Sequence, residues 1–142
     1  MIGMEILKPV VALAAWTMVM WIWMYATRIP AMKAAKVDIA NRIGGVGTDL
    51  NGVLPEKTQW IAQNYNHLHE APTVFYAVAI VLAIVGWGDG MNATIAWVYV
   101  GLRVLHSLVQ ATVNRVAVRF LIFGLSSLAL MALVTHAAIA VF

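Results

Sequence analysis

The sequence predicts an all-α integral membrane protein, a single domain of residues 1–142 with a bundle of four transmembrane helices. Of the 142 residues, 63% are hydrophobic and only 11% are charged, a composition too apolar for a soluble domain. The apolar residues form four stretches close to the ~20 residues that a helix needs to cross a bilayer, separated by proline, glycine or charge. The chain has no cysteine, which excludes disulfides, thiolate metal sites and a cysteine nucleophile.

The first predicted span covers approximately residues 9–27, none of which is charged, and Pro9 suits the first turn of a helix. Because this segment has neither a strong basic leader nor a small-residue cleavage site, we expect it to be retained rather than cleaved as a signal peptide. A cytoplasmic loop of approximately residues 28–55 follows. Its glycine-rich part lacks the Gly-Lys-Ser or Gly-Lys-Thr ending of a phosphate-binding loop, so we expect a mobile connection.

The second predicted span covers approximately residues 64–87, and we expect its helix to begin as early as Pro55 and to project beyond the bilayer. The short turn at residues 86–92 forces the third span, approximately residues 92–114, to run back beside the second. The fourth span covers approximately residues 118–140, and no Asp, Glu, Lys or Arg follows Arg119.

Lysine and arginine cluster on one side of these predicted spans. Five of the nine lie in or beside the first loop, the turn at residues 86–92 has none, and the third connection carries Arg115 and Arg119. The positive-inside rule therefore places the first and third connections in the cytoplasm and both chain termini on the other side. This distribution accounts for the net charge of +3, so we do not expect a nucleic-acid partner.

Polar side chains recur at helical spacing near the predicted cytoplasmic ends of the three later spans, which places them on shared helix faces. They are Gln63, Asn66, His67 and Glu70 in the second span, Arg103, His106 and Gln110 in the third, and Arg115, Arg119 and Ser126 in the fourth. Unpaired charge is costly inside a bilayer, and Glu70 and Arg103 lie at similar depths. We therefore expect these two residues to form an ion pair, inside the bundle or at a subunit interface.

Two interpretations of the polar residues stay open. Either they line a polar pocket that faces the cytoplasm and opens to the bilayer, or they only fix the register of the helices. For His106 the structural role is favoured. His67 and His69 point to opposite sides of a helix, so we do not expect them to share a metal ion.

Two stretches, "NHLHEAPTVFYAVAIVLA" and "GLRVLHSLVQATVNRVAVRFLIFGLS", resemble the MAPEG family, the membrane-associated proteins in eicosanoid and glutathione metabolism. The resemblance extends over nearly the whole chain and is greatest to small bacterial members without an assigned activity. It implies a homotrimer of four-helix subunits in a bacterial inner membrane. It also implies sites at the subunit interfaces near the cytoplasmic face, where glutathione binds and lipophilic substrates arrive from the bilayer.

The resemblance also implies roles for single residues. Glu70 is similar to a glutamate that contacts glutathione, Arg103 and His106 match an Arg-x-x-His motif, and Arg115 and Arg119 match two arginines before the last span. Arg119 stands where the family has an arginine that stabilises a thiolate. A permanent guanidinium beside the glutathione sulfur would favour this nucleophilic form.

The chain departs from the family pattern at several of these positions. Gln63, Tyr65 and His67 stand where the enzymes typically have arginine, histidine and asparagine. Gln110 replaces a tyrosine, and Phe123 replaces an aromatic hydroxyl. A neutral amide replaces neither the charge nor the two-pronged geometry of arginine, so the resemblance predicts the fold more strongly than the glutathione chemistry.

With these polar residues, the resemblance implies a glutathione- or thiol-dependent transferase or peroxidase that acts on lipophilic electrophiles at a cytoplasm-facing site between subunits. Arg119 is the predicted catalytic residue and glutathione the predicted cofactor, with membrane lipid around the trimer and no metal. The predicted ligand-binding residues are Gln63, Asn66, His67, Glu70, Arg103, His106, Gln110 and Arg115. The alternatives are a non-catalytic membrane protein, or an accessory subunit of a larger membrane complex, whose polar residues serve helix packing, and a binder of lipid or small anions.

Overall fold

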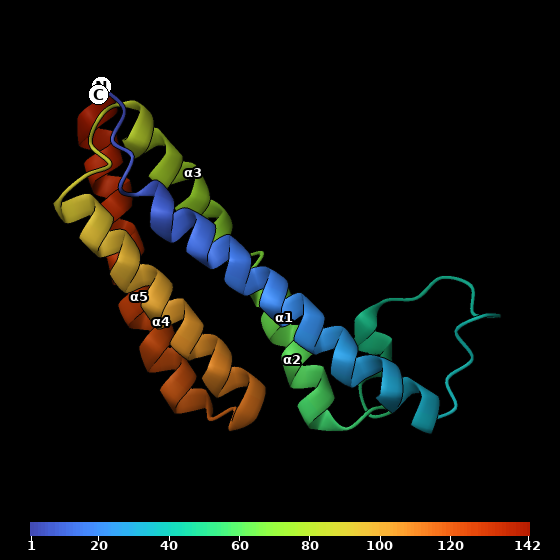
Figure 1. Ribbon diagram of the computed structural model, residues 1–142. Coiled ribbons are helices and arrows are strands. Elements are labelled where there is room, and N and C mark those ends of the chain that lie inside the picture. The colour runs from blue at the N-terminus through green and yellow to red at the C-terminus, as the bar shows by residue number, and fades with distance from the viewer.

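The computed structural model describes residues 1–142 and contains helices but no strand. Its elements are α1 (Leu7–Ala34), the 3-10 helix η1 (Gly47–Leu50), α2 (Glu56–His67), α3 (Ala71–Ile84), α4 (Met91–Thr112) and α5 (Val116–Val141). Figure 1 shows α1 running beside α2 and α3, and α4 running beside α5, with both chain ends at one end of the bundle. We call this the terminal end, and the opposite end, with residues 35–55 and the α4–α5 turn, the loop end.

Three helical segments are long and apolar enough to cross a membrane, namely Leu7–Ala34, Glu56–Ile84 and Val116–Val141. Only 17%, 33% and 17% of their most apolar windows are buried inside the bundle, so most of this apolar surface faces outward, where hydrocarbon or another subunit must cover it. The prediction of an all-helical membrane protein is therefore confirmed.

Helix α4 is more polar than the other three segments but has the length to cross a bilayer. Its 22 residues extend about 33 Å at 1.5 Å per residue. Its polar side chains Asn92, Arg103, His106 and Gln110 are buried, whereas Trp97 and other apolar residues on it are exposed. Because α4 turns its polar residues toward the bundle and its apolar residues outward, a fourth span stays our prediction.

The second predicted span is not one continuous helix. Helix α2 begins at Glu56, close to the expected start, but ends at His67, and α3 begins at Ala71. Pro72 lies at the start of α3. It has no backbone N–H, and its ring would clash with the carbonyl of Leu68 in an uninterrupted helix. The expectation that Gln63, His67 and Glu70 share one helical stripe is therefore wrong, because the break separates Glu70 from α2.

A group of hydrogen bonds holds part of the first loop to the bundle. The Arg28 guanidinium at the end of α1 donates to the Gly47 carbonyl oxygen at 2.9 Å and to Gln59 Oε1 at 3.2 Å. The Gln59 amide donates to the same Gly47 oxygen and to Asn51 Oδ1, at 3.1 and 2.8 Å. Residues 47–51 are thus fixed against α1 and α2.

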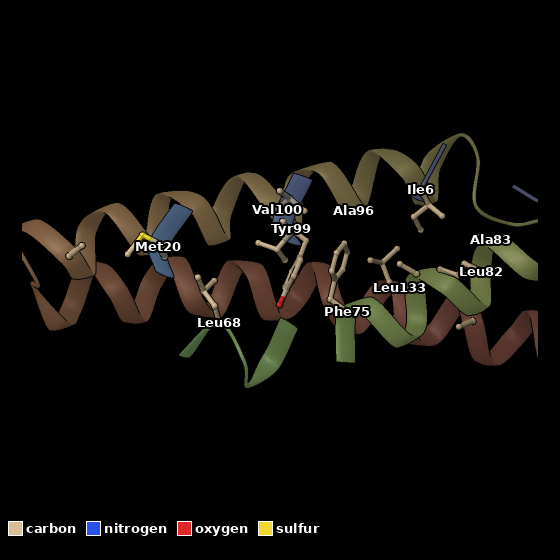
Figure 2. Packing of buried hydrophobic residues seen from close by; sticks show 14 of the residues in the cluster. Ile6, Met20, Leu68, Phe75, Leu82, Ala83, Ala96, Tyr99, Val100 and Leu133 are labelled. Atoms are coloured by element: carbon tan, nitrogen blue, oxygen red, sulfur yellow. The ribbon is translucent and has the colours of Figure 1, made fainter. Parts of the chain in front are cut away.

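The apolar core lies where α1, α3, α4 and α5 meet. Figure 2 shows the Phe75 ring of α3 between Tyr99 of α4 and Leu133 of α5, and all three side chains are buried. The Phe75 and Tyr99 rings are stacked, with centroids 4.6 Å apart and planes 25° apart. The aromatic pair joins α3 to α4, and Met20 and Leu13 of α1 belong to the same core cluster.

Backbone hydrogen bonds close the terminal end. Gly3 N–H donates to the Ala83 oxygen at 2.8 Å, and Ile6 N–H donates to the Gly88 oxygen at 2.9 Å. Glu5 N–H donates to Asp89 Oδ1 at 2.9 Å. The N-terminal segment therefore packs against the α3–α4 turn, as the predicted alternation of the spans requires.

We predict that Gly88→Ala destabilises the terminal end. A methyl group at Gly88 would contact the Gly3 carbonyl oxygen, lie 2.7 Å from Ile6 Cγ2 and lie 3.0 Å from Ala83 Cα. Overpacking of this kind costs about 1–3 kcal/mol, so the thermal unfolding midpoint in detergent should fall. Gly101→Ala is the control, because a methyl group there meets nothing within 4 Å. Equal midpoints for the two variants would contradict the packing at Gly88.

Candidate functional site

The polar face of α4 is buried as its spacing predicts. Arg103, His106 and Gln110 are 0%, 4% and 5% exposed, and Ser107 beside them is fully buried. These side chains face a region where α4 packs against α1, α2 and α5. The interior of the bundle near the loop end therefore holds a permanent cation, an imidazole and an amide.

Arg103 bonds to His67 across the α2–α4 contact. Its Nη2 lies 2.6 Å from His67 Nδ1. A guanidinium stays charged and only donates hydrogen bonds, so His67 Nδ1 must be the acceptor and cannot carry a proton. The neutral His67 ring therefore holds its proton on Nε2.

The predicted ion pair between Glu70 and Arg103 does not form within the chain. The Glu70 side chain is 67% exposed, and its carboxylate lies 3.8 Å from His67 Nε2. No carboxylate lies within 4.0 Å of Arg103. The break before Pro72 accounts for this correction, because it ends the helix that would have carried Glu70 toward α4. His67 takes the expected place of Glu70 as the partner of Arg103.

A cavity of about 220 Å³ opens beside this contact. It is lined by His67, His106, Gln110, Val116, Arg119, Phe120 and Phe123. The rings of His67 and His106 are stacked, with centroids 4.9 Å apart and planes 14° apart, and the Phe123 ring meets His67 edge-on at 5.8 Å. One wall is polar and carries a guanidinium, and the other is apolar. This arrangement suits a ligand with an anionic or polarisable atom on an apolar body.

The other predicted site residues lie outside this cavity. Gln63 is exposed and lines a separate cavity of about 280 Å³ with Gln59 and Trp60. Asn66 is exposed, and Arg115 is the exposed residue before the first turn of α5. Within one chain, the structure therefore brings together Arg119 and the three α2 and α4 residues His67, His106 and Gln110.

Sequence reasoning missed one buried polar residue of α2 and two residues of the cavity lining. Asn64 is fully buried, and its side-chain oxygen and nitrogen have no hydrogen-bond partner. Its position three residues before His67 was an available signal, since residues at that spacing share a helix face. Val116 and Phe120 gave no signal, because apolar residues of a membrane helix read alike whether they face lipid or a cavity. No group of three or more His, Cys, Asp or Glu residues could hold a metal ion.

Comparison with models of protein families matches residues 6–139 to the model described as the MAPEG family. No curated protein and no solved structure matches the chain. The matched range contains the whole of α1, α2, α3 and α4, nearly all of α5, and every residue that lines the cavity beside Arg103.

We predict that His67→Phe destabilises the protein by roughly 3 kcal/mol, because it removes the only hydrogen-bond acceptor of a buried guanidinium. Thermal unfolding in detergent measures the loss. Adding Arg103→Met to His67→Phe should recover part of it, since the double variant has no buried charge to satisfy. His69→Phe is the control, because His69 is exposed and bonds only to Tyr65 of its own turn. If both single variants unfold alike, the Arg103–His67 bond is not an important contribution to stability.

Proposed function

The chain belongs to the MAPEG family, and from that premise we propose that it is an integral membrane enzyme that joins the sulfur of a small thiol to a lipophilic electrophile. Glutathione is the proposed thiol, and reduction of a lipophilic peroxide by the same thiol is the related activity. The observation that carries the proposal is the cavity in which the guanidinium of Arg119 shares a lining with two imidazoles and an apolar wall.

Arg119 has the chemistry that thiol activation requires. Its guanidinium stays protonated at any physiological pH, so it stabilises a negative charge on sulfur without exchanging a proton itself. The thiol supplies the nucleophilic sulfur when bound. His67 adds a hydrogen-bond donor, because the Arg103 contact leaves its proton on Nε2. The amide of Gln110, which also lines the cavity, can orient the thiol compound by hydrogen bonding.

The apolar wall supports a lipophilic second substrate. Val116 and Phe120 are 69% and 74% exposed on the outer surface of the bundle, yet both also line the cavity. The cavity therefore opens at a surface that hydrocarbon or another subunit would cover. An apolar electrophile dissolved in the bilayer would reach the sulfur from this side without crossing water.

The size and charge of the cavity support a site completed by a second copy of the chain. Ligand pockets for compounds of this size typically measure about 300–1,000 Å³, whereas one chain encloses about 220 Å³. Glutathione carries two carboxylates, and Arg119 is the only arginine in the lining. We therefore propose the homotrimer that the family implies, with Arg115 and Glu70, which are exposed in one chain, available to a site between subunits.

A second candidate function rests on Arg103. It is fully buried and bonds only to His67, as expected of a residue that holds two helices in register. A non-catalytic membrane protein, or a subunit of a larger membrane complex, would need this contact but would have no use for Arg119.

We predict that glutathione binds the detergent-purified protein in isothermal titration calorimetry and that Arg119→Leu weakens binding at least about tenfold. The expected loss of about 1.4 kcal/mol or more is that of one charge-assisted contact. Arg42→Leu is the matched control, because Arg42 lies in the first loop, paired with Asp49. A well-folded oligomer that binds no glutathione, or binds it equally in both variants, would favour the packing function over the enzyme.

We also propose that both chain termini lie on the non-cytoplasmic side of a bacterial inner membrane. Because the chain has no cysteine, single cysteines report on topology without background labelling. A membrane-impermeant maleimide added to spheroplasts should label Met91→Cys, at the terminal end, and should label Ile43→Cys in the first loop only after permeabilisation. Both positions are exposed, at 66% and 99%. The reverse labelling pattern would show the opposite orientation.

A further inference from the structure

Thiol activation in the cavity leaves a proton without an assigned acceptor, and this inference rests on the proposed function. Forming the nucleophile requires the thiol to lose its proton. Arg119 cannot take it, because a guanidinium is already protonated. Of the seven lining residues, only His67, His106 and Arg119 are titratable. The acceptor within the cavity must therefore be one of the two imidazoles.

His67 is excluded by its own hydrogen bond. Arg103 occupies its Nδ1 at 2.6 Å, so the proton of the neutral ring is on Nε2, and neither nitrogen has a free lone pair. A second proton on His67 would have to sit on Nδ1, against the N–H groups of Arg103. His67 can donate a hydrogen bond to sulfur, but it cannot accept the proton of a thiol.

His106 is not restricted in this way. Its Nδ1 is buried without a partner, and no hydrogen bond to another group of the chain fixes its tautomer. Nε2 is then the ring nitrogen available to the cavity that His106 lines. The ring is held in place by its stack against His67, with planes 14° apart.

The charges around His106 couple its protonation to the arrival of a negative charge. On α4, Arg103 lies one turn and Tyr99 two turns before His106. His67 approaches from the end of α2, and Glu70 from the turn that follows α2. Arg119 approaches from α5. Two of these five groups are permanent cations, and Glu70, the only carboxylate among them, is mostly exposed. A proton on His106 is therefore tolerated once a thiolate enters the cavity to balance it.

We propose that His106 is the general base that takes the proton of the thiol, while Arg119 stabilises the sulfur. The S–H bond breaks, an N–H bond forms at His106 Nε2, and the electron pair stays on sulfur. With an α,β-unsaturated ketone as electrophile, a C–S bond then forms at the β-carbon. The displaced electron pair moves to the α-carbon and carbonyl oxygen, the resulting enolate takes a proton from water after the C–S bond has formed, and His106 releases the thiol proton to water. The thiol and the ketone thus become one thioether, and His106 returns to its neutral form.

Two thiols separate proton removal from sulfur binding. Glutathione is largely protonated at neutral pH, since thiols of this kind ionise near pH 8.5, whereas 4-nitrothiophenol is already ionised and needs no base. With the apolar enone 4-phenyl-3-buten-2-one, His106→Gln should lower kcat/KM for glutathione about 100-fold or more and leave that for 4-nitrothiophenol nearly unchanged. Arg119→Leu should lower both. An equal loss for the two thiols in His106→Gln would overturn the assignment.

The pH dependence of kcat/KM is a second test of His106 as the base. The wild-type kcat/KM for glutathione should reach its plateau at a pH below the range in which the free thiol ionises. The kcat/KM of His106→Gln should instead keep rising with pH as the free thiol ionises. His69→Gln, at an exposed histidine outside the cavity, should retain the wild-type shape. If His106→Gln does not fold, His106→Asn and the wild-type profile still decide, because a wild-type rate that follows free-thiol ionisation contradicts a base. Wild-type protein with no turnover of either thiol overturns the proposed function, and with it the base.

Proton release on binding tests His106 without any turnover. Glutathione is added near neutral pH to weakly buffered protein, with thiolate followed by ultraviolet absorbance and released protons by an indicator dye. In the wild type, thiolate should form without proton release, since His106 keeps the proton. In His106→Gln, any thiolate should appear with one proton released for each. Proton release that is the same in both proteins would show that His106 does not take the proton.

Discussion

The buried guanidinium of Arg103 determines how the two histidines of the cavity wall are arranged. A charge removed from water inside the bundle is tolerated only with a hydrogen-bonding partner, and the chain supplies one neutral acceptor, His67 Nδ1 at 2.6 Å. This single bond joins α2 to α4, sets the direction of the His67 ring and fixes its tautomer. The flat face of that ring then becomes the surface on which His106 stacks. The polar wall of the cavity therefore depends on one hydrogen bond between α2 and α4, although Arg119 itself lies on α5.

The break between α2 and α3 makes this bond available. If α2 continued through residues 68–70, Glu70 would follow His67 on the same face and compete for Arg103 as the stronger partner. Pro72 prevents that continuation, and the Glu70 side chain is 67% exposed. The guanidinium is thus left with a neutral imidazole in place of a carboxylate. Its positive charge stays uncompensated within the chain, beside a cavity proposed to receive an anion.

The parts of the site that sequence predicts are those carried by an unbroken helix. Arg103, His106 and Gln110 share a face because α4 is regular from Met91 to Thr112, and spacing alone is enough to group them. The stripe through Gln63 and Glu70 failed because a single proline changed the helix that the spacing assumed. The partner of Arg103 depends on where two helices cross, which no local pattern records. The apolar wall is equally hidden, since Phe120 and its neighbours look like any lipid-facing residues.

The hydrogen bonds of Gly3 and Ile6 to Ala83 and Gly88 join two segments that are made at different times during synthesis. Gly3 and Ile6 cannot form these bonds until residues 83–88, some eighty residues further along the chain, have also been made. Contacts that are so distant along the chain are slow to form because a large loop must close first. Residues 3–6 therefore lack these partners while α2 and α3 are being made. The terminal end of the bundle can therefore close only after α3 and the α3–α4 turn are in place.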